Sequence, residues 1–321
     1  MTEPTRISHW IDGKPFGGVA ERTGDVHDPA TGALTGRVDF ATSEVMDEAV
    51  AAAKAAFAEW GKTSLTKRVQ VLFAFRQLLN ERKEELAAII TAEHGKVLSD
   101  ALGEVTRGLE VVEFACGIPH LLKGGYSESV STGVDVYSIR QPLGVVGIIS
   151  PFNFPAMVPM WFFPVAIATG NTVVLKPSEK DPSAANWIAA LWAEAGLPKG
   201  VFNVVHGDKV AVDSLLTHKD VKSISFVGST AIGQQLGPEE IHAVIERADR
   251  ALYVAKRRGR DRERWAQAPE RLGEQWMSHI SSRSGRVLGP CEHLVAPAVV
   301  RKVAHRAGNA ERGVPMLSGQ A

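Results

Sequence analysis

Cysteine, net charge and long apolar runs are scarce in this 321-residue chain. Its two cysteines, Cys116 and Cys291, are too few for a disulfide framework, which predicts a reducing compartment. Lys and Arg number 36, as do Asp and Glu, so no overall charge attracts nucleic acid or an anionic membrane. No stretch approaches the ~18 apolar residues that span a bilayer, and no apolar core of a signal peptide follows Met1. We therefore expect a soluble cytoplasmic protein.

The zero net charge conceals two different parts of the chain. Residues 1–234 carry 21 Lys and Arg against 26 Asp and Glu, whereas residues 235–321 carry 15 against 10. The first part has 13 lysines and 8 arginines, and the second has 2 lysines and 13 arginines. Together with the length of the chain, this shift predicts at least two regions.

The first 122 residues read mainly as helices. An Asp-Gly pair between apolar residues predicts a hairpin over 10–16. Apolar residues recur at helical spacing over three further segments, 44–61, 66–94 and 99–122. Ser43 and Ser99 are the expected N-caps of the first and third helices, and Gly95 is the expected stop of the second.

From residue 134 the pattern changes to short β-branched strands that alternate with helices of ten to fifteen residues. The expected strands are 134–139, 145–149, 172–175, 202–205 and 223–227, and the expected helices are 157–169, 183–195 and 209–217. Such alternation predicts βαβ crossovers and an open parallel sheet. The fold class is therefore α/β, although the Gly-x-Gly-x-x-Gly fingerprint of the usual dinucleotide-binding domain is absent.

Polar residues follow two of these strands at their carboxyl ends. They are Ser150 and Asn153 after the first strand, and Lys176, Ser178, Glu179 and Lys180 after the second. A Gly228-Ser-Thr turn follows the last strand and should offer backbone N–H groups to a phosphate or pyrophosphate. Ligands of open α/β sheets bind beyond the carboxyl ends of the strands, so we expect the chemistry here.

Each of these signals also has an ordinary interpretation. The Gly-Ser-Thr turn can be a plain helix cap, Lys176 a solvated surface lysine, and Asn153 a residue that satisfies a turn. Their occurrence at the ends of consecutive strands of one sheet favours a site.

The motifs resemble a known family. Ser150-Pro-Phe-Asn-Phe-Pro155, Leu175-Lys-Pro-Ser-Glu179 and Phe226-Val-Gly-Ser-Thr-Ala-Ile-Gly233 are similar to the N-terminal half of the NAD(P)-dependent aldehyde dehydrogenase superfamily. The segments 116–124 and 134–143 resemble its CoA-acylating methylmalonate-semialdehyde dehydrogenases, enzymes of valine and inositol breakdown. The resemblance covers roughly residues 5–234, and it implies the family's Rossmann-like NAD-binding domain.

The resemblance assigns roles residue by residue. It implies that Lys176 and Glu179, with Lys180 beside them, hold the adenosine ribose, and a carboxylate there favours NAD over NADP. Ser229 would meet the pyrophosphate. Ser150 and Phe152 would line the nicotinamide side, and Asn153 would donate its side-chain N–H to the oxyanion formed from the aldehyde. Arg107, otherwise an exposed helix arginine, would bind the substrate carboxylate.

The resemblance ends after Gly233, before the cysteine nucleophile that such chemistry needs. Cys291 stands in Gly289-Pro-Cys-Glu-His293, which does not resemble the nucleophile's surroundings, and Cys116 fits better as a packing residue. Residues 238–262 resemble instead the closing helix of GGDEF diguanylate cyclase domains, without the cyclase motif or its metal carboxylates.

We therefore expect three regions: a truncated dehydrogenase domain over 1–234, a cyclase-like helix fragment over 235–264, and an irregular, poorly ordered tail over 265–321. The simplest explanation is a junction between unrelated sequences near residues 233–236.

Two functions follow from these expectations. The first is NAD-dependent oxidation of a semialdehyde to an acyl-CoA through a cysteine thioester, with CoA as co-substrate, neither nucleic acid nor a membrane as partner, and no metal. The second is a non-catalytic remnant that binds NAD or pairs with an intact homologue. The family is homo-oligomeric, and its oligomerisation sheet includes the strand equivalent to 134–140. We expect an open edge on that strand, because its partners come from later sequence that this chain lacks. A signalling protein built on the cyclase-like helix is a third interpretation.

Overall fold

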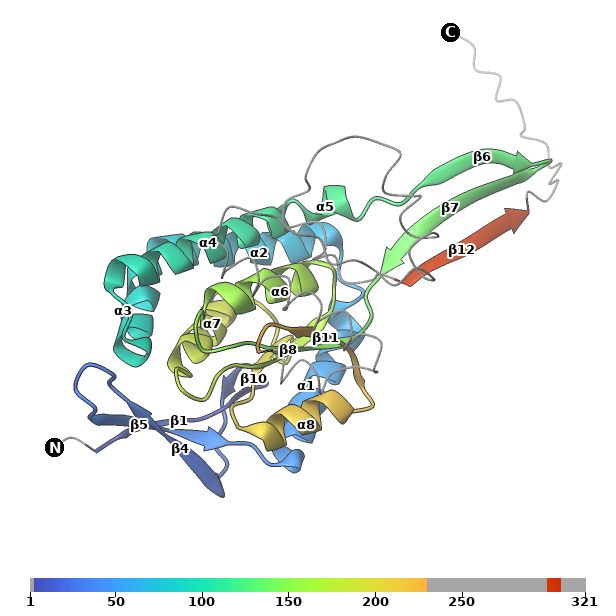
Figure 1. Ribbon diagram of the computed structural model, residues 1–321. Coiled ribbons are helices and arrows are strands. Elements are labelled where there is room, and N and C mark those ends of the chain that lie inside the picture. Colours follow the sequence, from blue (N-terminus) through green and yellow to red (C-terminus); the bar gives the residue numbers. More distant parts are fainter. Residues whose placement is uncertain (1–2, 230–298, 307–321) are drawn as a thin grey trace, which may run out of the picture.

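The structure, a computed structural model, describes residues 3–229 and 299–306. Its centre is a six-stranded sheet in the order β11-β8-β9-β10-β2-β3 (Figure 1). The parallel strands are β8 (Val145–Ile149), β9 (Thr172–Lys176), β10 (Phe202–Val204) and β11 (Val221–Phe226). The hairpin of β2 (Trp10–Ile11) and β3 (Lys14–Pro15) extends the sheet in antiparallel fashion beside β10. The predicted parallel sheet and hairpin are confirmed.

Helices cover both faces of this sheet. They are α1 (Ser43–Trp60), α2 (Leu65–Glu81), α3 (Lys83–His94), α4 (Leu98–Cys116), α5 (Ile118–Leu121), α6 (Met157–Ala168), α7 (Ser183–Glu194) and α8 (Lys209–Thr217). Val146 and Ile148 pack into the core of α2–α4, α6 and α7, whereas Val145 and Ile149 pack with α1 and α8 on the other face. Alternate residues of β8 therefore face two separate cores, which explains why the whole strand is apolar.

The helices differ from the prediction at four points. The segment 66–94 forms two helices, because Arg82 leaves helical geometry at φ −121° and its guanidinium binds Glu85 and Glu194 of α7 at 2.8–3.1 Å. The N-caps of α1 and α4 are Thr42 and Val97 rather than the predicted serines, and neither side chain accepts a capping hydrogen bond. The third predicted helix ends at Cys116, and α5 follows it. Gly95 ends α3 at φ 82°, as predicted.

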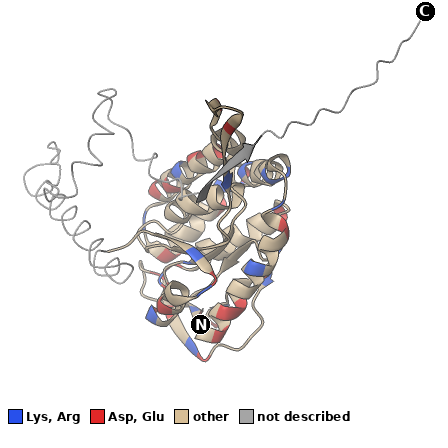
Figure 2. Cartoon of the chain, turned by 90° about the vertical axis from the view of Figure 1, so that its right-hand side faces the viewer, with Lys and Arg blue, Asp and Glu red and all other residues tan. Residues whose placement is uncertain are grey.

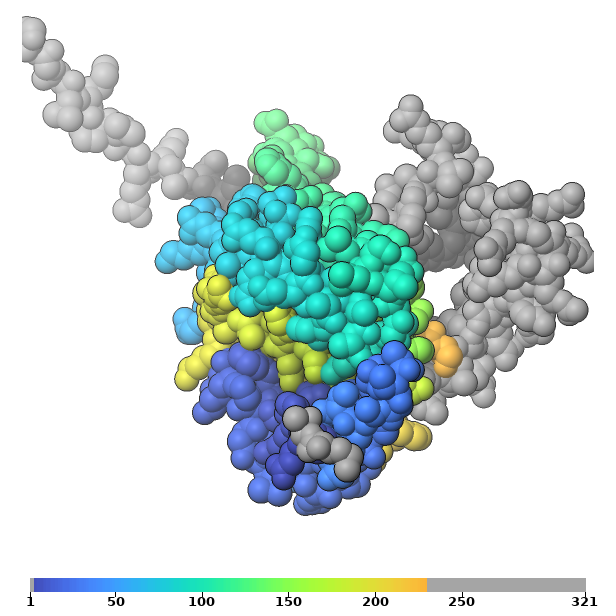
Figure 3. Space-filling model, turned by 90° about the vertical axis from the view of Figure 1, so that its left-hand side faces the viewer, coloured from blue at the N-terminus to red at the C-terminus, as the bar shows by residue number. Residues whose placement is uncertain are grey.

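A small sheet in the order β1-β5-β4 lies beside this body, and it consists of β1 (Thr5–Ile7), β5 (Leu34–Phe40) and β4 (Arg22–His27). The Arg6 guanidinium binds the buried Asp39 carboxylate at 2.6 Å and so joins β1 to β5. Figure 3 shows the N-terminal strands in dark blue below the helical layer of α2–α4 in cyan and green.

A third sheet in the order β12-β7-β6 projects from the body (Figure 1). It contains β6 (Tyr126–Ser131), β7 (Val134–Gln141) and β12 (Val299–Arg306). The predicted open edge on β7 is wrong, because β12 pairs antiparallel with it from Val299↔Gln141 to Arg306↔Val134. The C-terminal part of this chain thus supplies partners for backbone groups that we expected to remain unpaired.

Positions of Lys and Arg are interspersed with positions of Asp and Glu along the chain (Figure 2). Among the residues that the structure describes, no helix combines the length and the apolar composition that crossing a bilayer requires. The predicted regions beyond residue 234 lie largely outside the described residues, and so does the cyclase-like helix.

Candidate functional site

The carboxyl edge of the parallel sheet brings together residues from two predicted motifs. Ile149 of β8 pairs with Lys176 of β9, and the Ser150 N–H donates to the Lys176 carbonyl at 3.2 Å. Ser150 and Lys176 are buried, at 5% and 6% exposure. Among the described residues, the Ser150 hydroxyl has no hydrogen-bond partner. The polar groups that follow the two strands therefore meet at one edge, as the strand order requires.

Lys176 and Glu179 form an ion pair at this edge. The Lys176 Nζ lies 3.2 Å from the Glu179 Oε2, and the lysine side chain is 8% exposed whereas the glutamate is 37% exposed. The carboxylate thus stands at the surface above a nearly buried ammonium. This arrangement offers both an acceptor and a donor to hydroxyl groups of a ligand.

Asn153 and Phe152 are exposed in the loop that connects β8 to α6. The His94 ring stacks on the Phe152 ring at 4.9 Å between centroids, and the Lys180 Nζ lies 5.3 Å from the Phe152 centroid. Lys180 is therefore engaged with the loop through a cation–π contact. Sequence reasoning missed His94, which closes α3 just before Gly95.

Glu104 on α4 is a second residue that sequence reasoning missed. It is fully buried, and its Oε1 accepts hydrogen bonds from the N–H groups of Ala156 and Met157 at 2.9 and 3.1 Å. Its Oε2 pairs with the Lys96 Nζ at 2.6 Å. The signal was a carboxylate on the apolar face of an amphipathic helix, because buried charges require partners.

A second glutamate, the partly buried Glu93 on the preceding helix α3, acts in the same way. The Glu93 carboxylate accepts from the Ser183 N–H at 3.0 Å and from its hydroxyl at 2.5 Å, so it caps α7. Asp181, 1% exposed, lies nearby, and neither of its carboxyl oxygens has a hydrogen-bond partner among the described residues. Burial, followed by the neighbouring Glu93, raises the pKa of Asp181 to about 8. Burial also raises the pKa of Glu93.

The remaining predicted site residues, Ser229 and Arg107, are exposed. Ser229 is exposed and lies three residues after the end of β11. Strand β11 pairs with β8, and just before Ser229 the Val227 N–H donates to the Ile149 carbonyl at 3.2 Å. The helix expected after Ser229 lies outside the described residues. Arg107 is exposed on α4, and its role toward substrate stays a prediction.

Cys116 is confirmed as a packing residue. It is 8% exposed within the core of α2–α4, and burial raises the pKa of its thiol to about 11, which disfavours the thiolate. Cys291 lies outside the described residues. No cluster of three metal-ligating side chains occurs in the part of the chain that the structure describes.

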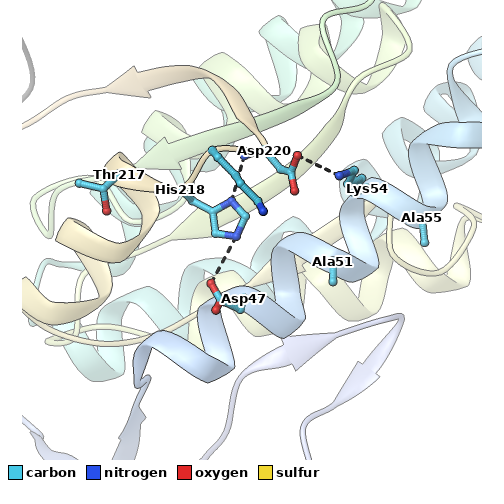
Figure 4. Close-up of a pocket in the computed structure, with 8 residues that line it drawn as sticks. Asp47, Ala51, Lys54, Ala55, Thr217, His218 and Asp220 are labelled. Carbon is cyan, nitrogen blue, oxygen red and sulfur yellow. Dashed lines mark hydrogen bonds and ion pairs between the residues drawn. The ribbon is translucent and has the colours of Figure 1, made fainter.

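A separate pocket of about 630 Å³ lies between α1 and the segment that joins α8 to β11 (Figure 4). His218 lies at its centre, 3.3 Å from Asp47, and its Nδ1 accepts from the Asp220 N–H at 3.1 Å. Lys54 pairs with Asp220 at 2.9 Å. This pocket stands at the amino end of β11, so it is distinct from the carboxyl edge.

Comparison with known proteins identifies the class of protein. The model of the aldehyde dehydrogenase family matches residues 18–248, and the chain belongs to this family. Its relatives include malonate-semialdehyde dehydrogenases of Pseudomonas aeruginosa, 53% identical over 235 residues, and of Geobacillus thermodenitrificans, 50% identical over 234 residues. These matches cover 73% of this chain but 47% and 48% of the relatives. The chain therefore spans about half the length of the curated relatives it matches.

Solved structures give the same result for the fold. A Sinorhizobium meliloti protein described as a methylmalonate-semialdehyde dehydrogenase, complexed with NAD, matches with 48% identity and a TM-score of 0.72 over 74% of this chain and 48% of that one. The methylmalonate-semialdehyde dehydrogenase of Oceanimonas doudoroffii matches with 50% identity and a TM-score of 0.71, over 72% of this chain and 47% of that one. The predicted family and fold class are confirmed. The cyclase resemblance finds no support in these comparisons.

Proposed function

We propose that the carboxyl edge of the parallel sheet binds NAD. The observation that carries this proposal is the pairing of Ile149 with Lys176, which brings the Ser150 hydroxyl, the Lys176 ammonium and the Glu179 carboxylate to one edge. A ribose diol needs both donors and acceptors, and this pair supplies both. The buried Ser150 hydroxyl, which has no partner within residues 3–229, fits a polar ligand at this place. A carboxylate at the ribose favours NAD over NADP, whose 2′-phosphate it would repel.

The proposed roles follow the family's motifs. Lys176 and Glu179, with Lys180 beside them, hold the adenosine ribose, and Ser229 meets the pyrophosphate. Ser150 and Phe152 line the nicotinamide side, which accepts a hydride when the cofactor is bound. Asn153 donates its side-chain N–H to the oxyanion of an aldehyde, and Arg107 binds the carboxylate of a semialdehyde substrate. The exposure of Asn153 and Arg107 leaves both side chains accessible to small molecules.

The relatives' names extend the proposal to a reaction, the oxidation of malonate or methylmalonate semialdehyde. The resemblance to CoA-acylating enzymes adds NAD as oxidant and CoA as acyl acceptor. That reaction requires a cysteine nucleophile. Cys116, the cysteine within the described residues, is buried with a raised thiol pKa, so we propose that it plays no part. NAD and CoA are both cytoplasmic metabolites, which supports a cytoplasmic location.

A non-catalytic role is the second candidate. It is favoured because the match covers only about half the length of the relatives. In this case the chain binds NAD, or pairs with an intact homologue, without turnover. The sheet of β6, β7 and β12 carries exposed apolar residues, Tyr126, Val130, Tyr137 and Ile139, which suit such pairing.

Calorimetric titration of the full chain with NAD tests the cofactor role. Lys176→Met removes the buried ammonium and should weaken binding roughly tenfold, the value of one charged hydrogen bond. Lys54→Met removes a lysine that pairs with Asp220 at the other edge, so it should leave the NAD affinity unchanged. Absence of binding by the unsubstituted chain contradicts the cofactor role.

Nicotinamide reduction in the presence of methylmalonate semialdehyde and CoA then separates the two functions. Absorbance that rises with the full chain but not with Cys291→Ala would establish turnover through that cysteine. Binding of NAD without reduction supports the non-catalytic role.

A further inference from the structure

An ion pair with little solvent exposure contacts the main chain of the loop that carries Asn153. Glu104 is 0% exposed, and Lys96 is 11% exposed in its side chain. Their charged atoms are 2.6 Å apart. Burial of two charges is costly unless every hydrogen-bonding atom is engaged, so the partners of this pair determine what it does.

The carboxylate of the pair engages the end of the loop. Glu104 Oε1 accepts from the N–H groups of both Ala156 and Met157. Ala156 is itself the N-cap residue of α6, and its side chain has no capping oxygen. Glu104 therefore supplies from another helix the acceptor that these first amides need.

The ammonium of the pair engages the middle of the loop. Lys96 Nζ donates to the Asn153 carbonyl at 2.9 Å and lies 4.6 Å from the centroid of the Phe154 ring. One ion pair thus binds the main chain at Asn153 and again at Ala156 and Met157. The Asn153 side chain remains free for a ligand, since the contact uses its backbone oxygen.

We propose that the Lys96–Glu104 pair is a positioning device for Asn153, acting through the main chain of the loop. This inference rests on the proposed role of Asn153 as an oxyanion donor. A single donor is effective only when it is held in place before the charge develops, and backbone anchoring at Asn153 itself and at Ala156 and Met157 provides that order. Neither Lys96 nor Glu104 needs to touch substrate or cofactor.

Two variants distinguish the ion pair from simple helix capping. Lys96→Met removes the ammonium and keeps an apolar stem beside Phe154. Glu104→Gln removes the charge but keeps a side-chain oxygen for the amides of Ala156 and Met157. Lys54→Met is the control, since it breaks an ion pair between α1 and the segment before β11. All three are made in the full chain.

The measurement is the backbone order of the loop by ¹⁵N relaxation, with amide exchange at residues 156 and 157. We expect the order parameter of Asn153 to fall from about 0.85 to below about 0.6 in Lys96→Met and Glu104→Gln. In Glu104→Gln the amides of Ala156 and Met157 should stay protected. Lys54→Met should change neither quantity. Unchanged order at Asn153 in both loop variants, or a loss of order spread equally over α4 and β8, would overturn the proposal.

Titration with NAD is the second test of the positioning role, and it measures the affinity of each variant for the cofactor. Because Ser150 and Phe152 belong to the same loop, NAD should bind Lys96→Met roughly fivefold more weakly, and Lys54→Met with unchanged affinity. If the unsubstituted chain does not bind NAD, the cofactor role fails, and the order parameters still decide the positioning role.

Discussion

Replacement of Asp181 by asparagine should remove a pH dependence of stability that the buried carboxyl group creates. Asp181 is 1% exposed, its oxygens have no hydrogen-bond partner among the described residues, and Glu93 lies close enough to oppose its ionisation. Its pKa is therefore raised from 3.8 to about 8 in the folded protein. Asparagine is nearly isosteric with the neutral acid and does not titrate.

The sign of the effect follows from proton linkage. Between pH 4 and 8 the folded protein retains the Asp181 proton whereas the unfolded chain loses it, so each rise in pH favours unfolding. One pH unit is equivalent to ~1.4 kcal/mol, and from pH 6.5 to 8 the carboxyl group should lower the free energy of unfolding by about 2 kcal/mol. Above pH 8 the slope disappears, because both states are ionised.

Urea denaturation of the unsubstituted chain and of Asp181→Asn at pH 6.5, 7.25 and 8 measures this slope. Burial lowers the pKa of His9 to about 4, so in the folded protein this ring titrates below the measured pH range. The stability that its neutral form contributes is lost as the pH falls from 6.5 towards 4. The variant should therefore gain about 2 kcal/mol relative to the unsubstituted chain between pH 6.5 and 8. Parallel pH profiles of the two proteins would refute the assignment of a protonated Asp181.

Three further predictions concern stability and reactivity. Asp208→Ala should lower the free energy of unfolding by about 1–2 kcal/mol in urea denaturation, since Asp208 caps α8 through the Val210 N–H at 3.1 Å and pairs with Arg22 at 2.7 Å. Gly95→Ala should lower the melting temperature by several degrees, equivalent to about 1–2 kcal/mol, because φ is 82° and the new Cβ would lie 2.6 Å from the Pro29 ring. Iodoacetamide at pH 7.5 should leave Cys116 unmodified in the native protein and alkylate it in urea, as peptide mass spectrometry can detect, because the thiol is buried and its pKa is about 11.

Strand positions were predictable from sequence because burial on both faces leaves a clear signal. The run 145–149 is wholly apolar, and its residues face two cores alternately. The break at Arg82 was not predictable from helical spacing, because the apolar period continues across it. At the break the Arg82 guanidinium contacts Glu194, which lies 112 residues later in the chain.

The candidate site was predictable in part for the same reason. Ser150 follows β8, Lys176 ends β9 and Glu179 stands three residues later, so the order of the strands brings them together. Glu104 and Lys96 come from the helical layer, and their partners are loop amides and a carbonyl more than fifty residues away. A sequence pattern shows that a glutamate is out of place on an apolar face, but it does not show what the glutamate binds. The partner of β7 failed as a prediction because the pairing segment lies far away, beyond residue 298.

The helical layer therefore does more than cover the sheet. Glu93 of α3 caps α7, and Glu104 of α4 caps α6, so the two helices that follow β8 and β9 both receive acceptors from this layer. Lys96, between them in sequence, binds the loop before α6. These contacts fix the carboxyl edge using residues 93–183 alone, and none of them involves a nucleophile. An ordered cofactor edge does not by itself supply the nucleophile that turnover requires, so NAD titration tests cofactor binding and nicotinamide reduction tests the whole proposed reaction.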